Sequence, residues 1–380
     1  MKTVKSILLL ILCMAGIVAC SSDDDLVGNW KISEEFPGKA RTGAVTFTID
    51  GQPYVGLGLD VDRYEKTDFW VFKLGEAWSE VAPFPGKARY GAVAFSDGQY
   101  GYVGLGYAQN LTEGGQIVPE EYFSDFWRFD PSLTTAGIKV VDQDTIDVSY
   151  QGGWTKIESV FPGEKRQFAI GFFVGGKGYV GTGSGEGKTG NLNNYWAFDP
   201  LTQKWDSEPI IKGKSRQGAV VWVIGNSAYI AGGVQGTSAN YINEVLKFTP
   251  GQEPAWEELE PWKDLEGRSW DNDYAKIRRS NGVAFVVGKE EDQSVRAYVT
   301  LGSVGTAKFD CWEFNPYEGE KGRWDEVTGF PANYGARLNA VAFTMDDVGY
   351  VTLGGSSTNS ASQSTYKFYP GVKDNEYDDD

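Results

Sequence analysis

The chain repeats one twelve-residue stretch almost letter for letter. Residues 36–47 read FPGKARTGAVTF and residues 84–95 read FPGKARYGAVAF, so ten of twelve positions are identical after a shift of 48 residues. A period of this length indicates a repeat architecture, in which each unit buries its hydrophobic face against its neighbours. We therefore expect an array of similar units.

The same pattern occurs six times. Each copy has an arginine, two small or polar residues and an apolar run, followed by a second run that ends in glycine and a third run rich in aromatic residues. In five copies a tryptophan then opens a fourth run. Four short strands in a unit of about 50 residues are typical of a β-propeller blade. The six arginines are Arg41, Arg89, Arg166, Arg216, Arg279 and Arg337.

This order of strands resembles the kelch repeat over residues 29–370, although the second strand ends in a full Gly-Gly pair in only two copies, at 232–233 and 354–355. The resemblance implies an all-β fold, a six-bladed kelch-type β-propeller over residues 28–370, followed by an acidic C-terminal tail at 371–380. The last copy lacks the Trp run, whereas Trp30 precedes the first copy. We therefore expect an N-terminal outer strand to close the ring, because closure leaves no unpaired sheet edge.

The N-terminus carries the features of a secretion signal. Lys2 and Lys5 precede an apolar run that is too short to span a membrane. The ending IVAC at 17–20 resembles a bacterial lipobox, which implies a signal peptide at 1–19 and lipidation of Cys20. Residues 21–25 (SSDDD) of the acidic tether at 20–27 resemble the export signal of Bacteroidetes surface lipoproteins, and the alternative is a flexible tether without a signal. We expect an outer-membrane lipoprotein, held by its lipid anchor alone, that faces either the cell surface or the periplasm.

Composition excludes several functions. The net charge of −17 argues against a nucleic-acid partner, because phosphate binding needs a basic surface. The chain has no histidine, which excludes Ser-His-Asp and Cys-His catalysis and histidine-ligated zinc, copper or iron. Cys311 lies in the alternating stretch FDCWEF, where we expect a buried, inert thiol. We expect a monomer without cofactor or metal.

The candidate ligand site is the mouth of the propeller. The first strand of each blade lies nearest the axis, so the six arginines should gather at one end of the central channel, where ligands of rigid scaffolds often bind. Two roles are open for them: binding a carboxylate-bearing ligand, or bonding an Asp or carbonyl of their own blade. Loops at 107–124 and 257–278 belong to the same face. The second loop contains Trp262, Trp270 and Tyr274, which either stack on a sugar or pack the loop against the blades.

These features predict a non-catalytic binding module for a glycan, peptide or protein ligand at the propeller mouth. Two alternatives remain open: an enzyme similar to sialic acid mutarotase, which resembles this chain in its six kelch blades and envelope location, and a protein-interaction scaffold. Galactose oxidase shares the kelch propeller, but its copper site needs histidines that this chain lacks.

Overall fold

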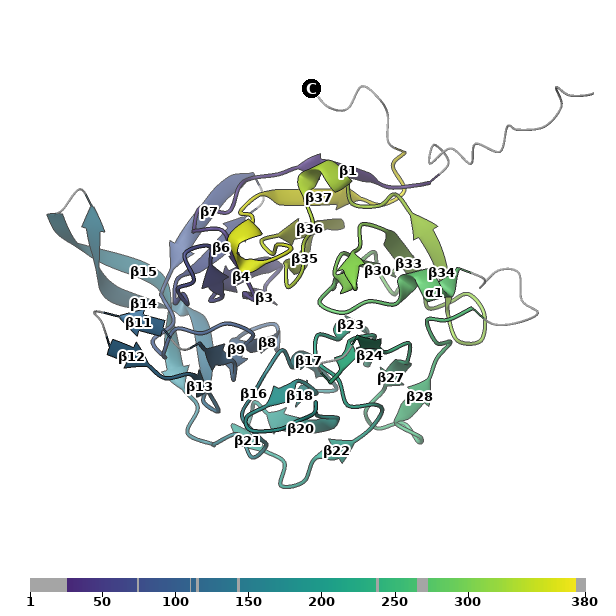
Figure 1. The fold of residues 1–380 in the computed structure, drawn as a ribbon, viewed down its shortest axis with the longest axis horizontal. Coiled ribbons are helices and arrows are strands. Elements are labelled where there is room, and N and C mark those ends of the chain that lie inside the picture. Colours follow the sequence, from purple (N-terminus) through teal and green to yellow (C-terminus); the bar gives the residue numbers. More distant parts are fainter. Residues whose placement is uncertain are drawn as a thin grey trace, which may run out of the picture.

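The protein folds as a ring of β-sheets around a central axis (Figure 1). We describe it from a computed structural model, which covers residues 26–373 apart from 74, 110, 114–115, 142–143, 237–238 and 265–272. Within these ranges the helical segments are one turn of α-helix and two 3-10 turns, so the fold is all-β as predicted. They are α1 (Tyr274–Ile277), Ala332–Tyr334 and Thr358–Ser360.

Successive four-stranded units make up the ring, and neighbouring strands within each unit pair antiparallel. The first strands of successive units contact each other and surround the axis. Units 1 to 3 consist of β3 (Val45–Ile49), β4 (Gln52–Gly56), β6 (Phe69–Lys73) and β7 (Glu76–Val81); β8 (Val93–Ser96), β9 (Gly101–Gly104), β14 (Phe126–Val141) and β15 (Asp144–Lys156); and β17 (Ile170–Val174), β18 (Lys177–Gly181), β20 (Asn194–Asp199) and β21 (Lys204–Trp205), with β22 (Ile210–Ile211) also on β20. Units 4 to 6 consist of β23 (Val220–Ile224), β24 (Ser227–Ala231), β27 (Val245–Phe248) and β28 (Trp256–Glu258); β29 (Val283–Val287), β30 (Arg296–Thr300), β33 (Cys311–Asn315) and β34 (Arg323–Val327); and β35 (Val341–Met345), β36 (Val348–Thr352), β37 (Thr365–Tyr369) and β1 (Asn29–Ile32).

Unit 6 takes its outermost strand from the other end of the chain. β1 pairs antiparallel with β37, and Trp30 lies opposite Phe368 in this register. The two rings pack with their centroids 4.8 Å apart. The indole of Trp30 also donates a hydrogen bond of 3.0 Å to the carbonyl of Thr328, which follows unit 5. The described N-terminal segment is thus held to the last strand of the fold.

Buried and half-buried residues alternate along the first strands, so that one face of each strand packs in the core and the other faces the channel. In β3, Val45, Phe47 and Ile49 are buried, whereas the two threonines between them are half-buried. Phe47 stacks on its cross-strand partner Tyr54 with ring centroids 5.3 Å apart and planes at 12°. An aromatic pair stacks in the same way in every other unit, and each contributes about 1 kcal/mol beyond its buried area. The repeated aromatic positions therefore build the core between strands.

A glycine in the second strand makes room for this core. A Cβ atom on Gly101 of unit 2 would lie 2.2 Å from a ring carbon of Phe47 in unit 1. Glycine therefore lets the two units approach closely enough for the ring of Phe47 to fill the space between them.

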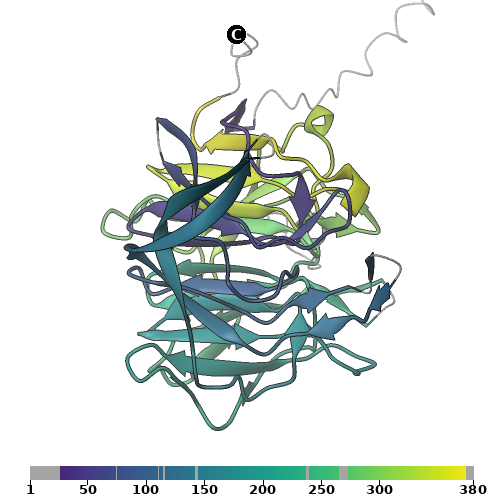
Figure 2. The ribbon, with the colours of Figure 1, turned by 90° about the vertical axis from the view of Figure 1, so that its left-hand side faces the viewer.

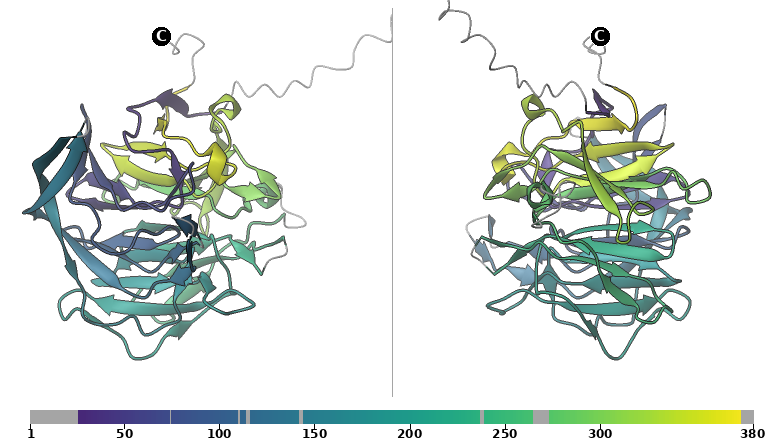
Figure 3. Two further views of the ribbon diagram at one scale, coloured as in Figure 1. Left: turned by 60° about the vertical axis from the view of Figure 1, so that its left-hand side comes forward. Right: turned by 90° about the vertical axis from the view of Figure 1, so that its right-hand side faces the viewer.

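One hairpin of unit 2 extends beyond its unit. The strands β14 and β15 form a long ribbon along the outer edge of unit 1 (Figures 2 and 3). β15 pairs in parallel with β7 at Gln151 and Val81, and Lys139 forms an ion pair of 2.7 Å with Glu80. This pairing joins units 1 and 2 into one eight-stranded sheet. The long insertion between the third and fourth runs of unit 2, at 131–153, is therefore mainly a strand ribbon.

Short two-stranded ribbons lie at the end of the channel where the first strands begin. In two of them, a segment between the second and third strands pairs with the segment before the first strand. In the other four, the two halves of the loop between the second and third strands pair with each other. We call this end the channel mouth. The ribbons are β2 (Arg41–Thr42) with β5 (Leu59–Asp60), β10 (Tyr107–Ala108) with β13 (Glu121–Tyr122), β11 (Leu111–Glu113) with β12 (Gln116–Val118), β16 (Arg166–Gln167) with β19 (Ser184–Gly185), β25 (Val234–Gln235) with β26 (Asn240–Tyr241), and β31 (Ser303–Val304) with β32 (Thr306–Ala307).

Candidate functional site

The six repeated arginines are buried inside their units, with exposed fractions of 0–1%. Arg89 shows how such a charge is accommodated. Its Nη1 and Nη2 atoms donate to the two carboxylate oxygens of Asp125 at 2.6 and 3.1 Å. Nη1 also donates to the carbonyl of Leu105, and Nε donates to the carbonyl of Lys87. Paired and hydrogen-bonded in this way, a buried guanidinium can keep its charge.

The other five arginines repeat this arrangement with different third-strand partners. In every unit Nη1 donates to the carbonyl of the residue directly before the glycine that follows the second strand. Burial lowers the pKa of Arg166 to about 10, which still leaves it charged at neutral pH. The third-strand partners are Asp68 for Arg41, Asn194 for Arg166, Glu244 for Arg216, Asp310 for Arg279, and the carbonyl of Ser364 for Arg337.

The sequence left two roles open for the arginines, ligand binding and bonding within their own unit. These contacts favour the second, structural role. The guanidinium groups do not line the channel mouth as expected of a ligand site, because each one turns into its own unit to reach an acceptor there. Direct ligand contact by these arginines stays a prediction and would require them to leave their present partners. The candidate site must therefore be sought among the side chains that surround them.

Two closed rings of backbone hydrogen bonds join the units at the mouth. In the first ring, the glycine after the second strand donates to the carbonyl of the next unit's arginine, as Gly58 does to Arg89 at 2.9 Å. The bond recurs from Gly106, Gly183, Gly233, Gly302 and Gly354, and the last of these reaches Arg41. In the second ring, the residue two positions after each arginine donates to its counterpart in the preceding unit at 2.8–3.2 Å. Its members are Gly43, Gly91, Phe168, Gly218, Asn281 and Asn339, all with positive φ.

A pocket of 380 Å³ lies over this second ring, between units 6, 1, 2 and 3. We call it the mouth pocket. Amide, hydroxyl, guanidinium and aromatic groups line it, which is the mixture found in sites for polar ligands. Its volume falls in the range of small-molecule pockets, about 300–1,000 Å³. The side chains with polar or aromatic groups are Thr42, Arg63, Tyr90, Gln109, Phe168, Asn339, Ser356, Ser357 and Thr358.

Arg63 is the cation of the mouth pocket, and two loops hold it in place. Its Nη2 atom donates to Gln109 Oε1 at 3.1 Å, and Gln109 Nε2 donates back to the carbonyl of Arg63 at 2.8 Å. The backbone N–H of Gln109 is itself held by Glu65 at 2.8 Å. Arg63 belongs to the loop of unit 1 and Gln109 to the loop of unit 2. The exposed guanidinium therefore sits where two neighbouring units meet.

The backbone that presents Arg63 is in the left-handed region, with φ at 67°. Buried Asp60 stabilises it: its Oδ1 atom accepts the N–H groups of Asp62 and Tyr64 at 3.0 and 2.9 Å, and its carbonyl accepts the N–H of Arg63 at 2.9 Å. A non-glycine residue in this region costs about 1–2 kcal/mol. Such strain tends to occur at functional sites.

Aromatic side chains continue from the pocket toward the loop of unit 2. Tyr90 lies between Phe168 and Tyr107, with ring centroids 6.0 and 5.6 Å apart, and Tyr107 packs on Tyr122 at 4.7 Å. Burial raises the pKa of Tyr90 to about 12, so its hydroxyl is neutral at physiological pH. Of these rings, Tyr90 and Phe168 line the mouth pocket, where they offer a ligand apolar edges and one hydroxyl group.

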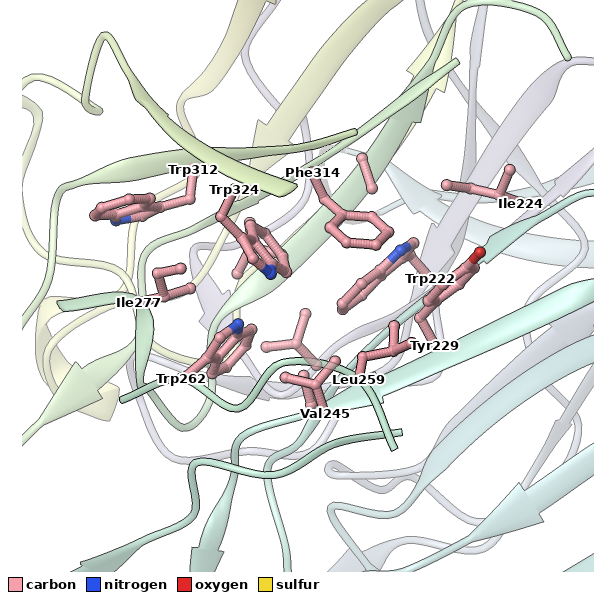
Figure 4. Close-up of a cluster of buried hydrophobic side chains, with 14 of the residues drawn as sticks. Trp222, Ile224, Tyr229, Val245, Leu259, Trp262, Ile277, Trp312, Phe314 and Trp324 are labelled. Atoms are coloured by element: carbon pink, nitrogen blue, oxygen red, sulfur yellow. The ribbon is translucent and has the colours of Figure 1, made fainter. Parts of the chain in front are cut away.

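The aromatic residues predicted in the loop at 257–278 belong to the core. Trp262 is 0% exposed and packs on Trp324 with ring centroids 5.7 Å apart (Figure 4). Tyr274 is 1% exposed, and its hydroxyl accepts the N–H of Trp324 at 2.8 Å. For these two residues the packing alternative fits the contacts, because neither ring faces solvent. Trp270 lies outside the described residues.

Sequence reasoning did not single out Arg63, Tyr90 or Asn339, whereas Gln109 lies in the loop at 107–124 that was expected on this face. For Tyr90 the available signal was variation: the residue after each repeated arginine is Thr, Tyr, Gln, Gln, Ser or Leu, whereas the arginine itself never changes. Positions that change between units are not needed for the common packing. They are therefore open to a ligand.

Comparison with known proteins supports the fold. No protein-family model matches the chain, and no curated protein matches its sequence. The fold matches the solved structure of YjhT with a TM-score of 0.62, covering 87% of this chain and 95% of that chain at 15% sequence identity. YjhT is a kelch-repeat propeller, so the likeness shows that this chain has a propeller-like all-β fold.

Two further observations concern chemistry elsewhere in the chain. Cys311 is fully buried, and burial raises the pKa of its thiol far above the ordinary value, which agrees with an inert side chain. Across the described ranges, no helix is both long and apolar enough to cross a membrane.

Proposed function

We propose that the chain forms a six-bladed kelch-type propeller closed by β1. The two rings of backbone bonds support this, since each passes through six equivalent positions and returns to its start. The pairing of β1 with β37 supports the closure. A crystal structure with another number of units around the axis would contradict the proposal.

We further propose that the propeller is a non-catalytic binding module for a hydroxyl-rich or anionic ligand, a glycan or a peptide, at the mouth pocket. The observation that carries this proposal is the placement of Arg63. An exposed guanidinium on a left-handed backbone, fixed by Asp60 and Gln109, overhangs a pocket of 380 Å³ with hydroxyl and amide walls. A planar guanidinium donates paired hydrogen bonds to a carboxylate, and the remaining walls suit hydroxyl groups.

The pocket walls favour binding over catalysis. Of the described residues that line the mouth pocket, Arg63 and Tyr90 are the ones with ionisable side chains. A general base must lose its proton near the working pH, and the raised pKa of Tyr90 places it far from that condition. The described lining residues can therefore recognise a ligand, but neither of their two ionisable side chains suits the role of a general base.

The test compares Arg63→Ala with the control Arg323→Ala. Arg323 forms ion pairs with Glu318 and Asp325 at a turn of unit 5, outside the mouth pocket. Both variants and the parent protein are applied to an array of neutral and acidic glycans and acidic peptides, and hits are measured by calorimetry. Losing a charge-assisted contact should weaken binding by about 10- to 100-fold in Arg63→Ala alone.

The same samples separate the alternatives. Equal weakening in both variants, or binding that Arg63→Ala leaves unchanged, would refute a site at the mouth pocket. Proton NMR of N-acetylneuraminate anomers tests the mutarotase-like alternative, because an enzyme of that type would speed their exchange. Binding without faster exchange supports the binding module.

We also propose that lipidated Cys20 holds this module at the outer membrane. The support is the lipobox-like sequence that ends at Cys20, which lies outside the described residues. The acidic residues that follow it favour display on the cell surface.

A further inference from the structure

The opposite end of the central channel contains a chamber that the proposed function does not use. Its volume is 490 Å³, and it lies where the first strands approach their turns into the second strands, as Thr48 does before the turn at 50–51. The mouth pocket lies at the other end of the same strands. A section of 200 Å³ separates the two, and one layer of its walls consists of Ala44, Ala92, Ala169, Ala219, Gly282 and Ala340.

The chamber has two kinds of wall. Units 6, 1 and 2, which are neighbours in the ring, present hydroxyl groups next to the far opening, and units 3, 4 and 5 present apolar side chains at the same level. None of the described residues that line the chamber has an ionisable side chain. The hydroxyl side consists of Thr344, Thr48 and Ser96, and the apolar side consists of Phe173, Val223 and Val286.

Some of the hydroxyl groups that line the chamber have a hydrogen-bond partner in the described part of the protein, and one buried group has none. Thr344 Oγ1 donates to the carbonyl of Val286 at 2.7 Å, and Ser96 Oγ donates to the carbonyl of Tyr100 at 2.8 Å. One layer deeper, Thr46 Oγ1 is buried and has no hydrogen-bond partner among the described residues. A buried hydroxyl without a partner is unfavourable by about 1–3 kcal/mol. This oxygen is covered in the present conformation, so a ligand atom in the chamber would bond it after rotation of the Thr46 side chain about χ1.

We propose that the chamber binds a small neutral molecule with an apolar face and one hydroxyl or carbonyl group, such as an aromatic alcohol. The apolar face lies against Phe173 and the two valines, and the polar group bonds to Thr46. A charged ligand is disfavoured because these walls offer no counter-charge for an ion that loses its water. This site is independent of the mouth pocket, from which it is separated along the channel.

The experiment uses benzyl alcohol as the probe and benzoate as its charged counterpart. Saturation-transfer NMR with competition gives the affinity of each probe for the parent protein and three variants. Val223→Trp fills the chamber and should weaken benzyl alcohol binding at least about tenfold. Arg63→Ala changes only the mouth pocket, so it serves as the control and should leave binding unchanged.

Thr46→Val keeps the shape of the side chain and removes its hydroxyl group. It should weaken benzyl alcohol binding by about three- to tenfold, the loss of one hydrogen bond. The melting temperature should stay equal or rise, because a hydroxyl without a partner has been removed; a purely structural role for Thr46 would instead lower it. The proposal is overturned if benzoate binds as tightly as benzyl alcohol. It is also overturned if the Thr46→Val variant binds benzyl alcohol as tightly as the parent protein does. If Val223→Trp fails to fold, the Thr46→Val result decides.

Discussion

Replacing Arg89 by methionine should strongly destabilise the fold. Arg89 is 0% exposed and donates four hydrogen bonds, two of them to Asp125. It also lies over the ring of Phe123, with 3.9 Å between the guanidinium carbon and the ring centroid. Methionine fills a similar space but donates nothing. The carboxylate of Asp125 then loses its counter-charge, and the carbonyls of Leu105 and Lys87 lose a donor.

The expected loss follows from these contacts. Removing one partner of a fully buried ion pair costs about 3–5 kcal/mol, because the other charge stays buried. The side chain of Asp125 is 24% exposed, so water screens part of its charge and its share falls to about 2 kcal/mol. Each carbonyl without its donor adds about 1 kcal/mol. The free energy of unfolding should therefore fall by about 4 kcal/mol.

Urea unfolding followed by tryptophan fluorescence measures this change. The exposed Arg63→Ala variant is the control, and its free energy of unfolding should stay within about 0.5 kcal/mol of the parent. The double variant Arg89→Met/Asp125→Leu should recover part of the loss, since it removes both charges. A loss below about 1 kcal/mol in Arg89→Met would show that the repeated arginine does not hold the unit together.

Two further predictions concern acid stability and anchoring. Burial raises the pKa of Asp125, but the hydrogen bonds and charge of Arg89 outweigh burial and hold that pKa below its ordinary value. The pair's contribution is therefore complete above the unfolded-state pKa of about 4 and is lost as pH falls through the lower folded-state pKa. Asp125→Asn should flatten this acid-side fall in melting temperature, and an unchanged profile would contradict the assignment. Cys20→Ala should move the protein from the membrane fraction to the soluble fraction of cells, and retention in the membrane would refute the lipid anchor.

The sequence predicted the general fold because the repeated residues are the ones that form it. Each repeated arginine bonds the turn after its second strand, and the glycine of that turn bonds the next arginine's carbonyl. A backbone with φ of 76–99° at these glycines favours the residue without a side chain, so the pattern returns in every unit.

The glycine pairs were harder to interpret. Gly354 occupies the position of Gly233 in the ring, so Leu353, not Gly355, corresponds to Gly232. The position of Gly232 is a leucine or threonine in the other units, with φ of 57–62°. The arginine donates to the carbonyl of this residue, which offsets the strain. Alignment of glycine letters alone cannot detect that compensation.

The mouth pocket could not be predicted from the sequence for a different reason. Its walls come from units 6, 1, 2 and 3, and they meet only through the geometry of the ring. Arg63 faces the pocket because Asp60 fixes an irregular turn and because Gln109 reaches it from another unit. The Asp60 turn lies within one repeat, but the contact with Gln109 joins two repeats and cannot be found in either one alone.

The second ring of backbone bonds has an electrostatic consequence. In a helix the peptide dipoles add from one end to the other and leave partial charges at both ends. Here six N–H to carbonyl bonds follow one another around the axis and return to their start. Dipoles arranged in such a closed circle cancel, so the backbone contributes little net field along the channel. The local charge at the mouth pocket is then set by side chains such as Arg63, so a substitution there changes that charge while the ring of backbone bonds stays intact.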